Sequence, residues 1–473
     1  MLFNSEQYLV FLPIVFVVTW ALPPRVRPAF LLAASYYFYA SWNPPFLLLI
    51  GGLTLANYGI GVVQGRRKPR RKSLLVVALV IDLGALAVFK YLGFLDQTTN
   101  RLAEILGLPI GLPGVNLILP LGLSFFSFEF IHYQVDLYRG FDPILNPIRF
   151  ALFPAFFPTQ IAGPIKRYQD FDKQVRGMPH FDPVLCLEGA ELIARGLFKK
   201  VALADSLLPY AATVFNAPTH ASTLDVLGGL LAFSFQIYLD FSGYTDIGRG
   251  SAQMLGYTVP VNFDAPYLCT SIRDFWHRWH MSLSYWLRDY LYIPLGGSRR
   301  GPLRTYLNLM ITMALGGLWH GAAWHFVVWG TGQGGALAIN RAWQELPKPK
   351  VGLPKWLAVA TGWSLTQATV LVLWSLFRAP NLTAALQLWT SAFHVSLRRN
   401  LIDAKGLAII VLIAAAVLGI QLVTRRFNPR ALLARWAGAV VLRPAYVTAL
   451  GASAFVAAMA QNGAVHRFIY FQF

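Results

Sequence analysis

Long apolar runs, separated by short basic or proline-containing segments, make up most of this chain. In the N-terminal part the runs are Tyr8 to Leu22, Ala29 to Trp42, Pro45 to Val63 and Leu74 to Leu95. In the C-terminal part they are Trp356 to Phe377, Leu407 to Val423 and Val440 to Met459. Because a spanning helix needs about 20 apolar residues, this pattern predicts a polytopic membrane protein, although Ala29 to Trp42 is short for a crossing.

Prolines and glycines interrupt the pattern in the middle of the chain. Arg149 to Ile165 contains Pro154, Pro158 and Gly163-Pro164, so it is a poor straight helix. Irregular backbone is tolerated at membrane depth where protein or a water-filled cavity covers it, which favours a re-entrant segment here. We expect an all-α polytopic transmembrane protein with about eleven spanning or re-entrant helices. We divide it into N-terminal helices (1–100), a core (101–345) and C-terminal helices (346–473).

Composition and charge support the membrane interpretation. The chain is 56% hydrophobic and only 13% charged, whereas soluble domains carry roughly 25% charged residues. The net charge of +19 comes from basic residues between apolar runs, as expected of loops at the cytoplasmic surface of a lipid bilayer. No basic patch interleaves with aromatic residues on an exposed face, so no nucleic-acid partner is expected. Two cysteines cannot support a disulfide framework.

The basic clusters also predict the topology. Six of the seven residues from Arg66 to Lys72 are basic, which places this loop in the cytoplasm. Two crossings separate it from Arg25 and Arg27, so the N-terminus is expected outside the cytoplasm. No positive segment precedes the first apolar run, so no cleaved signal peptide is expected. A further cytoplasmic surface is predicted at Lys166, Arg167, Lys173 and Arg176.

One histidine in an uncharged apolar run is the main candidate for chemistry. His320 lies within Met310 to Trp329, which contains no Asp, Glu, Lys or Arg. Lipid does not solvate an ionisable group, so this position is a functional hypothesis; the competing interpretation is a packed histidine bonded to a backbone carbonyl. A neutral imidazole can take a proton from a hydroxyl or thiol that attacks a carbonyl. Trp319 and Trp324 would exclude water, and Gly321 would let substrate approach the backbone.

Other polar residues carry weaker signals. His277 and His280 are three apart and would share one side of a helix, but no further ligand motif accompanies them, so no metal site is predicted. His325 is interpreted as structural or rim-facing. Asp240 and Asp246 are six apart, do not share a helical face, and are interpreted as capping or loop residues. No phosphate-binding loop or nucleophile elbow is present, which argues against an ATP-driven pump and a serine hydrolase of that kind.

Several short motifs occur together in one order. They are Ile161 to Pro164, Leu239 to Asp246, Phe275 to Ser284, Trp286 to Tyr290, Gly317 to Gly321 and Phe468 to Phe473. In this order they resemble the membrane-bound O-acyltransferase family, in the bacterial branch that includes the alginate O-acetyltransferase membrane subunit. The resemblance covers nearly the whole chain.

The resemblance implies a fold, a reaction and two site residues. About eleven spanning or re-entrant helices would form a ring around a thin partition, with a funnel on each side and a central tunnel, and residues 101–345 would be the catalytic core. His320 would be catalytic, and His280 would be a second site residue near the tunnel. Acetyl-CoA would donate the acetyl group from the cytoplasm, and the protein would hold no bound cofactor. A periplasmic or membrane-anchored acetyltransferase partner would receive the acetyl group and place it on a polysaccharide, at the bacterial inner membrane.

Substrate-binding candidates lie beside the two histidines. Arg278 and Arg288 could bind the phosphates of CoA or anchor lipid headgroups. Trp279 and Trp319 are placed with them as substrate-binding residues. No role is carried onto His277. The family often has a further histidine after the Trp-Gly pair that matches Trp329-Gly330. Here residues Thr331 to Gly334 contain no histidine, so the role of that position is not carried over.

Two other classes of function stay open at this point. A transporter or flippase commonly has paired broken helices in corresponding halves. Here the broken run Arg149 to Ile165 has no evident counterpart in the second half of the chain. A scaffold subunit of a polysaccharide secretion complex would leave His320 without a function. The resemblance favours an alginate-like exopolysaccharide as the acceptor, while the sequence itself leaves cellulose and peptidoglycan open, and a D-alanyl-type acceptor is a further possibility.

Overall fold

The computed structural model describes the chain apart from residues 68, 110, 115–116, 162, 347–353, 394–399, 428–438, 461–465, 467 and 470–473. The described residues form helices and no strand, as the sequence predicts. They divide into two compact units, Met1–Ala190 with Gly248–Pro260 and Glu191–Ile247 with Val261–Phe473. Two helices, α10 (Pro183–Leu197) and α12 (Thr223–Met254), contribute residues to both units. The predicted three-part division stays a prediction.

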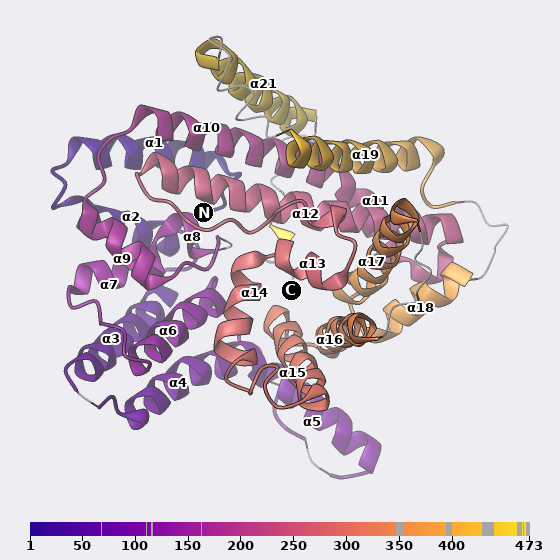
Figure 1. Cartoon of the computed structure of the whole chain (residues 1–473), viewed down its shortest axis with the longest axis horizontal. Coiled ribbons are helices and arrows are strands. Elements are labelled where there is room, and N and C mark those ends of the chain that lie inside the picture. Colours follow the sequence, from indigo (N-terminus) through magenta and orange to yellow (C-terminus); the bar gives the residue numbers. More distant parts are fainter. Residues whose placement is uncertain are drawn as a thin grey trace. The chain divides into compact units, whose positions relative to one another are not determined.

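The first unit contains the N-terminal helices, of which the α-helices are labelled in Figure 1. They are α1 (Glu6–Ala21), α2 (Arg27–Ala40), α3 (Phe46–Gly65), α4 (Lys72–Leu86), the π-helix η1 (Ala87–Tyr91), α5 (Leu92–Leu106), α6 (Leu123–Tyr138), α7 (Pro147–Ala155), α8 (Phe157–Gln160) and α9 (Tyr168–Gly177). The side chain of Ser5 accepts a hydrogen bond from the Tyr8 amide and begins α1. The Tyr8 hydroxyl is then 2.7 Å from that of Ser251.

The proline-interrupted run forms two short helices rather than one long one. Helices α7 and α8 are separated at Phe156, which is fully buried. Ala162 of the Ile161 to Pro164 motif lies outside the described residues. Lys166, predicted at a cytoplasmic surface, is instead 3% exposed. Its ammonium group lies 2.8 Å from the Glu129 carboxylate, and this ion pair compensates the loss of hydration. The surface prediction was therefore wrong for Lys166.

The second unit contains the candidate site. Besides its parts of α10 and α12 it has the π-helix η2 (Phe198–Ala204), α11 (Asp205–Asn216), the 3₁₀ turns η3 (Pro218–His220) and η4 (Pro266–Leu268), α13 (Ile272–Arg278), α14 (Met281–Leu287), the π-helix η5 (Arg288–Tyr292), α15 (Pro302–His320), α16 (Trp324–Glu345), α17 (Lys355–Arg378), α18 (Leu382–Phe393), α19 (Ala404–Arg426) and α21 (Ala439–Ala460). Helices α15 and α16 pack side by side (Figure 1).

Five helical segments of the described chain are long and apolar enough to cross a membrane. They are Phe46–Gly65, Lys72–Leu106, Thr223–Met254, Lys355–Arg378 and Ala404–Arg426. Shorter apolar helices occupy Glu6–Ala21 and Pro444–Ala460. These segments agree with a multi-pass protein, while the number eleven stays a prediction.

Candidate active site

His320 is the last residue of α15, and aromatic rings surround it. The next residue, Gly321, is extended and ends the helix. The imidazole of His320 is 8% exposed. Three ring centroids lie near its own: Trp319 at 4.9 Å, Trp329 at 5.2 Å and Phe377 at 5.3 Å. We call Trp319, Trp329 and Phe377 the aromatic cage. All three rings approach with an edge-to-face geometry, so His320 is held in a largely apolar environment.

Glycine contacts between α15 and α16 bring the aromatic cage together. A Cβ on Gly317 would overlap the Phe326 carbonyl oxygen and lie 3.0 Å from Cα of Gly330. The two backbones therefore touch one turn before His320, which brings Trp329 of α16 against the histidine. Gly321 has a different role from the one predicted. The phenyl ring of Phe326 occupies the space that its missing side chain leaves, so this glycine serves packing rather than substrate approach.

His280 occupies a strained turn between α13 and α14. Its backbone is left-handed, with φ 43° and ψ 53°, which costs a residue other than glycine on the order of 1–2 kcal/mol. The fully buried Asn262 holds this turn. Its carbonyl oxygen accepts from the Met281 amide at 3.0 Å, and its side-chain oxygen accepts from the Ser282 hydroxyl at 2.7 Å. Surrounding structure thus enforces the strain, as is common at functional sites.

The imidazole of His280 is 1% exposed. It meets the ring of Phe241 edge to face, with centroids 4.7 Å apart. Neither ring nitrogen has a hydrogen-bond partner within the described part of the chain, which is unusual for a buried polar group. His280 lies outside the five candidate spans, and burial lowers its pKa to about 3. The ring is therefore neutral near pH 7.

One indole links the two histidines. The ring centroid of Trp319 lies 4.9 Å from that of His320 and 6.4 Å from that of His280. The structure thus brings together three of the predicted site residues, from the end of α15 and the start of α14. Two imidazoles packed against aromatic side chains form a site that is suited to proton transfer and that excludes water.

The sequence matches the membrane-bound O-acyltransferase family over residues 65–378. This stretch is more than half of the chain and includes both histidines. The chain belongs to this family.

Similar relatives are named as acetylating enzymes. A probable alginate O-acetylase of Azotobacter vinelandii is 42% identical over 83% of this chain and 78% of that protein. One from Pseudomonas aeruginosa is 41% identical over 83% of this chain and 75% of that protein. A peptidoglycan O-acetyltransferase of Helicobacter pylori is 34% identical over 82% of this chain and 79% of that protein. The protein is thus a multi-pass membrane O-acyltransferase.

The other histidines of this acyltransferase lie in different environments. His277 is exposed at the end of α13, whereas His280 is buried, so the prediction that they share one side of a helix was wrong. The helix ends between them, at Arg278. His325 lies at the start of α16, with its Nδ1 2.9 Å from the Leu376 carbonyl oxygen, in agreement with a structural role. Among the described residues no group of His, Cys, Asp and Glu could hold a metal ion.

Of the two tryptophans predicted to exclude water, Trp319 contacts His320 and Trp324 does not line the site. Trp324 is 52% exposed because it begins α16 beyond the turn. Trp329 and Phe377 take its place in the aromatic cage, and sequence reasoning had not singled them out as site residues. Both come from helices that follow His320 in the chain, so only their packing against α15 reveals them. Asn262 and Phe241 were also missed, although Phe241 lies inside the Leu239 to Asp246 motif.

The substrate-binding candidates of this acyltransferase have partners within the chain. Nε of Arg278 lies 2.8 Å from the Asp274 carboxylate, and Nε of Arg288 lies 2.7 Å from that of Asp289. Arg278 has a 14% exposed side chain, whereas that of Arg288 is 56% exposed. Trp279 is 1% exposed and stacks on Phe275, with centroids 5.4 Å apart. It therefore belongs to an aromatic core next to His280.

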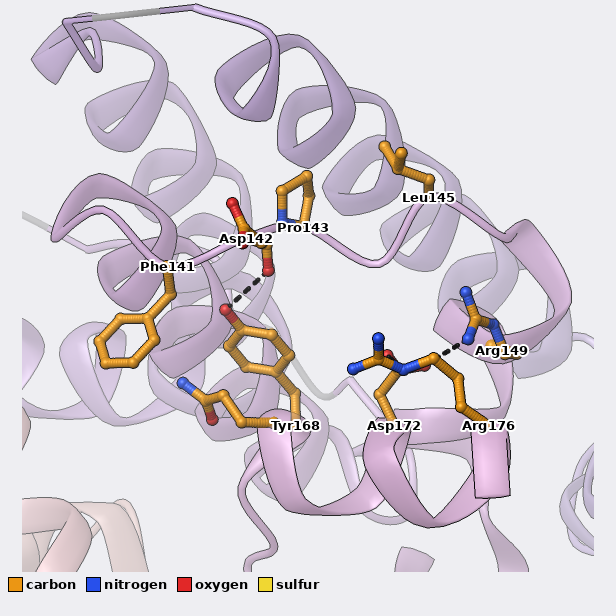
Figure 2. Close-up of a pocket in the computed structure, with 9 residues that line it drawn as sticks. Phe141, Asp142, Pro143, Leu145, Arg149, Tyr168, Asp172 and Arg176 are labelled. Atoms are coloured by element: carbon orange, nitrogen blue, oxygen red, sulfur yellow. Dashed lines mark hydrogen bonds and ion pairs between the residues drawn. The ribbon is translucent and has the colours of Figure 1, made fainter. Parts of the chain in front are cut away.

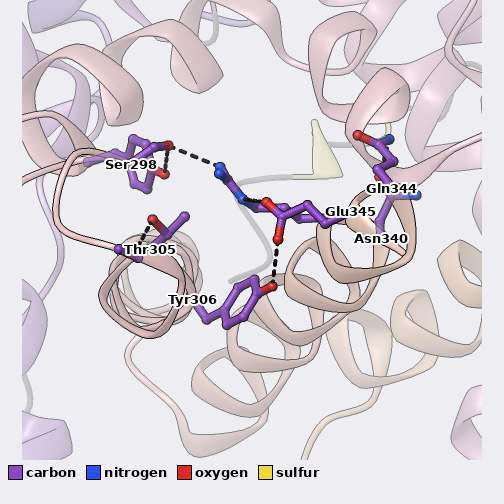
Figure 3. Close-up of polar contacts among 9 residues, drawn as sticks. Ser298, Thr305, Tyr306, Asn340, Gln344 and Glu345 are labelled. Atoms are coloured by element: carbon purple, nitrogen blue, oxygen red, sulfur yellow. Dashed lines mark hydrogen bonds and ion pairs between the residues drawn. The ribbon is translucent and has the colours of Figure 1, made fainter. Parts of the chain in front are cut away.

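Polar contacts secure the end of the α15–α16 pair. Arg341 donates to the Ser298 hydroxyl at 3.0 Å and to the Glu345 carboxylate at 2.9 Å, and the Tyr306 hydroxyl reaches the same carboxylate at 3.2 Å (Figure 3). These bonds connect both helices to the preceding loop, at the end of α15 far from His320.

Asp240 and Asp246 lie within α12, not in a loop, so the capping and loop interpretation was wrong. Asp246 pairs with Arg195 at 3.0 Å and with Lys199 at 2.7 Å. Asp240 pairs with Lys200 at 2.7 Å and also accepts from the Ile469 amide at 2.7 Å. Both carboxylates therefore stabilise structure through ion pairs. Of the terminal motif, residues 470–473 lie outside the described residues.

Proposed function

We propose that this membrane-bound O-acyltransferase takes an acetyl group from cytoplasmic acetyl-CoA and supplies it for O-acetylation of an extracytoplasmic polysaccharide. An alginate-like polymer is the proposed acceptor, because relatives named as probable alginate O-acetylases are 41–42% identical over 83% of the chain. The more distant peptidoglycan O-acetyltransferase, at 34% identity, makes peptidoglycan the second candidate. The proposed location is the bacterial inner membrane.

The observation that carries this proposal is the pair of histidines around Trp319. In the proposed reaction His320 is the general base. Its neutral imidazole takes the proton of an acceptor hydroxyl while the hydroxyl oxygen bonds to the acetyl carbonyl carbon. The bond between that carbon and the CoA sulfur then breaks, and the thiolate leaving group takes the proton from the imidazolium. The aromatic cage keeps water from competing for the acetyl group.

His280 is proposed to assist by orienting. At a pKa of about 3 it is neutral at physiological pH, so it offers one N–H donor and one acceptor nitrogen. Neither is used within the described part of the chain. A substrate oxygen that forms a hydrogen bond with His280 would lie near His320, because both imidazoles contact Trp319. The imidazole would thus position the reacting group without carrying the transferred proton.

The proposal includes the path of the acetyl group. Helices form a ring around a thin partition, with one funnel for acetyl-CoA and one towards the periplasm, and no cofactor is retained. A periplasmic or membrane-anchored acetyltransferase partner receives the group and transfers it to polysaccharide hydroxyls. Relatives named for polymer acetylation support such an acceptor.

The test is the acetyl content of the secreted polymer in cells that carry single variants. His320→Ala should insert at normal levels, checked by immunoblot, and lose acetylation by at least about 10²-fold, as expected when a general base is removed. His277→Ala is the matched control, because His277 is exposed and lies outside the site. Wild-type acetylation by a well-expressed His320→Ala protein would overturn the catalytic assignment.

A second measurement separates this proposal from a transporter or a scaffold. Purified protein with acetyl-CoA and a hydroxyl acceptor should release free CoA, detected with a thiol reagent. A transporter or scaffold predicts none. Release that persists unchanged in His320→Ala would place the chemistry elsewhere.

A further inference from the structure

The first unit contains a polar cavity at the end of a candidate membrane span. The cavity has a volume of about 390 Å³ and is lined by Phe141, Asp142, Pro143, Leu145, Arg149, Tyr168, Gln169, Asp172 and Arg176 (Figure 2). This volume is in the range of small-molecule sites. No residue of the cavity belongs to the proposed active site.

Contacts with α3 place the cavity at the level of lipid headgroups. Span α3 ends at Gly65, where an added Cβ would overlap the ring of Pro143. Closer to the middle of α3, the Tyr58 hydroxyl donates to the Leu145 carbonyl at 2.6 Å. Beyond the end of the span, Arg70 donates to the Phe141 carbonyl at 3.4 Å. The segment that lines the cavity therefore lies where α3 leaves the apolar layer and the basic loop begins.

Two arginines in the cavity share one carboxylate. Nη1 of Arg149 lies 3.5 Å from Asp172, and Nε of Arg176 lies 3.0 Å from it. Figure 2 shows the three side chains together on the side of the cavity away from Phe141. Each guanidinium has five N–H donors, so donors remain after these contacts. Two positive charges against one negative charge leave a single positive charge, which matches one phosphodiester.

The rest of the lining suits the other parts of a phospholipid. The carboxylate of Asp142 is in no ion pair within the described residues, and the Asp142 backbone carbonyl accepts from the Tyr168 hydroxyl at 3.1 Å. This acidic group can accept hydrogen bonds from a primary ammonium. Phe141 and Leu145 are 50% and 58% exposed. At the membrane surface, such apolar side chains contact acyl chains.

We propose that this cavity binds the headgroup of an ethanolamine phospholipid in the leaflet that borders the Arg66 to Lys72 loop. The phosphodiester contacts Arg149 and Arg176, and the ammonium contacts Asp142. The two arginines and the two aspartates sum to zero charge, as does this lipid. A glycerol headgroup lacks the cation that Asp142 requires, and a choline headgroup cannot donate a hydrogen bond to it. The bound lipid would pack between α3 and the α7–α9 segment.

The test is native mass spectrometry of the full-length protein purified from nanodiscs with equal amounts of ethanolamine, glycerol and choline phospholipids. The wild type should retain the ethanolamine lipid in preference to the other two. Arg149→Gln with Arg176→Gln should lower its retention at least about tenfold, the effect of losing a charge-assisted bond. Arg101→Gln is the matched control, because Arg101 also pairs with a carboxylate but is exposed on α5. It should retain the lipid as the wild type does.

Asp142→Asn tests the ammonium contact without disturbing a buried ion pair. This variant should lose the preference for the ethanolamine lipid over the choline lipid. It should still retain phospholipid, because the two arginines still contact the phosphodiester. Equal retention of all three lipids by the wild type, or unchanged retention in the double variant, would overturn the proposal. Displacement of the lipid by millimolar soluble phosphoethanolamine or inorganic phosphate would also overturn it, because the site would then bind a free phosphate compound. None of these readouts depends on acetyl transfer.

Discussion

Gly317 of α15 and Gly330 of α16 touch through their backbones, since a Cβ on either one would lie 3.0 Å from the Cα of the other. This contact lies one turn before His320 and sets the separation of the two helices at the site. Because backbone atoms cannot rotate away as a side chain can, the position of His320 relative to Trp329 depends on the absence of a side chain at both glycines.

Gly317→Ala should therefore destabilise the protein and impair activity together. The added methyl group would overlap the carbonyl of Phe326, and overpacking of this kind costs about 1–3 kcal/mol. The measurement is thermal unfolding in detergent alongside polymer acetylation. Gly335→Ala on α16 is the control, because the nearest atom to its added Cβ is the Met310 sulfur at 4.0 Å. Normal stability and activity in Gly317→Ala would contradict the close-packing argument.

His280 should make stability depend on pH. Its pKa of about 3 in the folded protein lies below the unfolded value of about 6.5. Between these values only the unfolded chain binds the proton, so stability falls as the pH falls below about 6.5. From pH 7 to pH 5 the loss should be about 2 kcal/mol.

The variant for this test is His280→Asn, because asparagine tolerates the left-handed conformation and does not titrate here. Its unfolding temperature should change less between pH 7 and pH 5 than that of the wild type. Titration of the other histidines is common to both proteins and cancels in the comparison. An identical pH dependence in the two proteins would show that His280 does not titrate as its burial requires.

Arg278→Gln and Arg288→Gln should raise the apparent KM for acetyl-CoA if these arginines bind its phosphates. A lost charge-assisted bond corresponds to about a tenfold change. Both guanidinium groups already contact a carboxylate, so a bound phosphate would share them or displace the aspartate. Arg341→Gln, which removes a similar pair with Glu345, is the control. An unchanged KM in both variants would leave only the interpretation as headgroup anchors.

The N-terminus and the Arg66 to Lys72 loop should lie on opposite sides of the membrane. The N-terminal amine lies 2.9 Å from the hydroxyl of Ser41, which ends α2, whereas the loop follows the far end of α3. A cysteine at Ser73, which is exposed at the start of α4, should resist an impermeant thiol reagent added to intact spheroplasts. A cysteine at Glu6, also exposed, should react. Efficient labelling at Ser73 would reverse the predicted orientation.

The membrane character, the helical class and the prominence of His320 were readable from the sequence. Apolar runs of spanning length have few alternatives in a lipid bilayer, because their backbone groups must bond internally. An ionisable residue within such a run stands out without any structural information. The sequence also favoured a structural or rim-facing role for His325, and its contact with the Leu376 carbonyl oxygen agrees with the structural role.

The tertiary structure alone decided the environment of residues whose neighbours come from distant segments of the chain. Helical spacing placed His277 and His280 on one side, but Asn262 holds His280 in a left-handed turn that ends the helix between them. The sequence placed Lys166 at a surface, but it lies between α8 and α9 and Glu129 of α6 supplies its counter-charge. An inference from sequence pattern assumes that a predicted helix continues and that charged side chains lie in water. Contacts between segments far apart in the chain override both assumptions, because they can offset backbone strain and lost hydration.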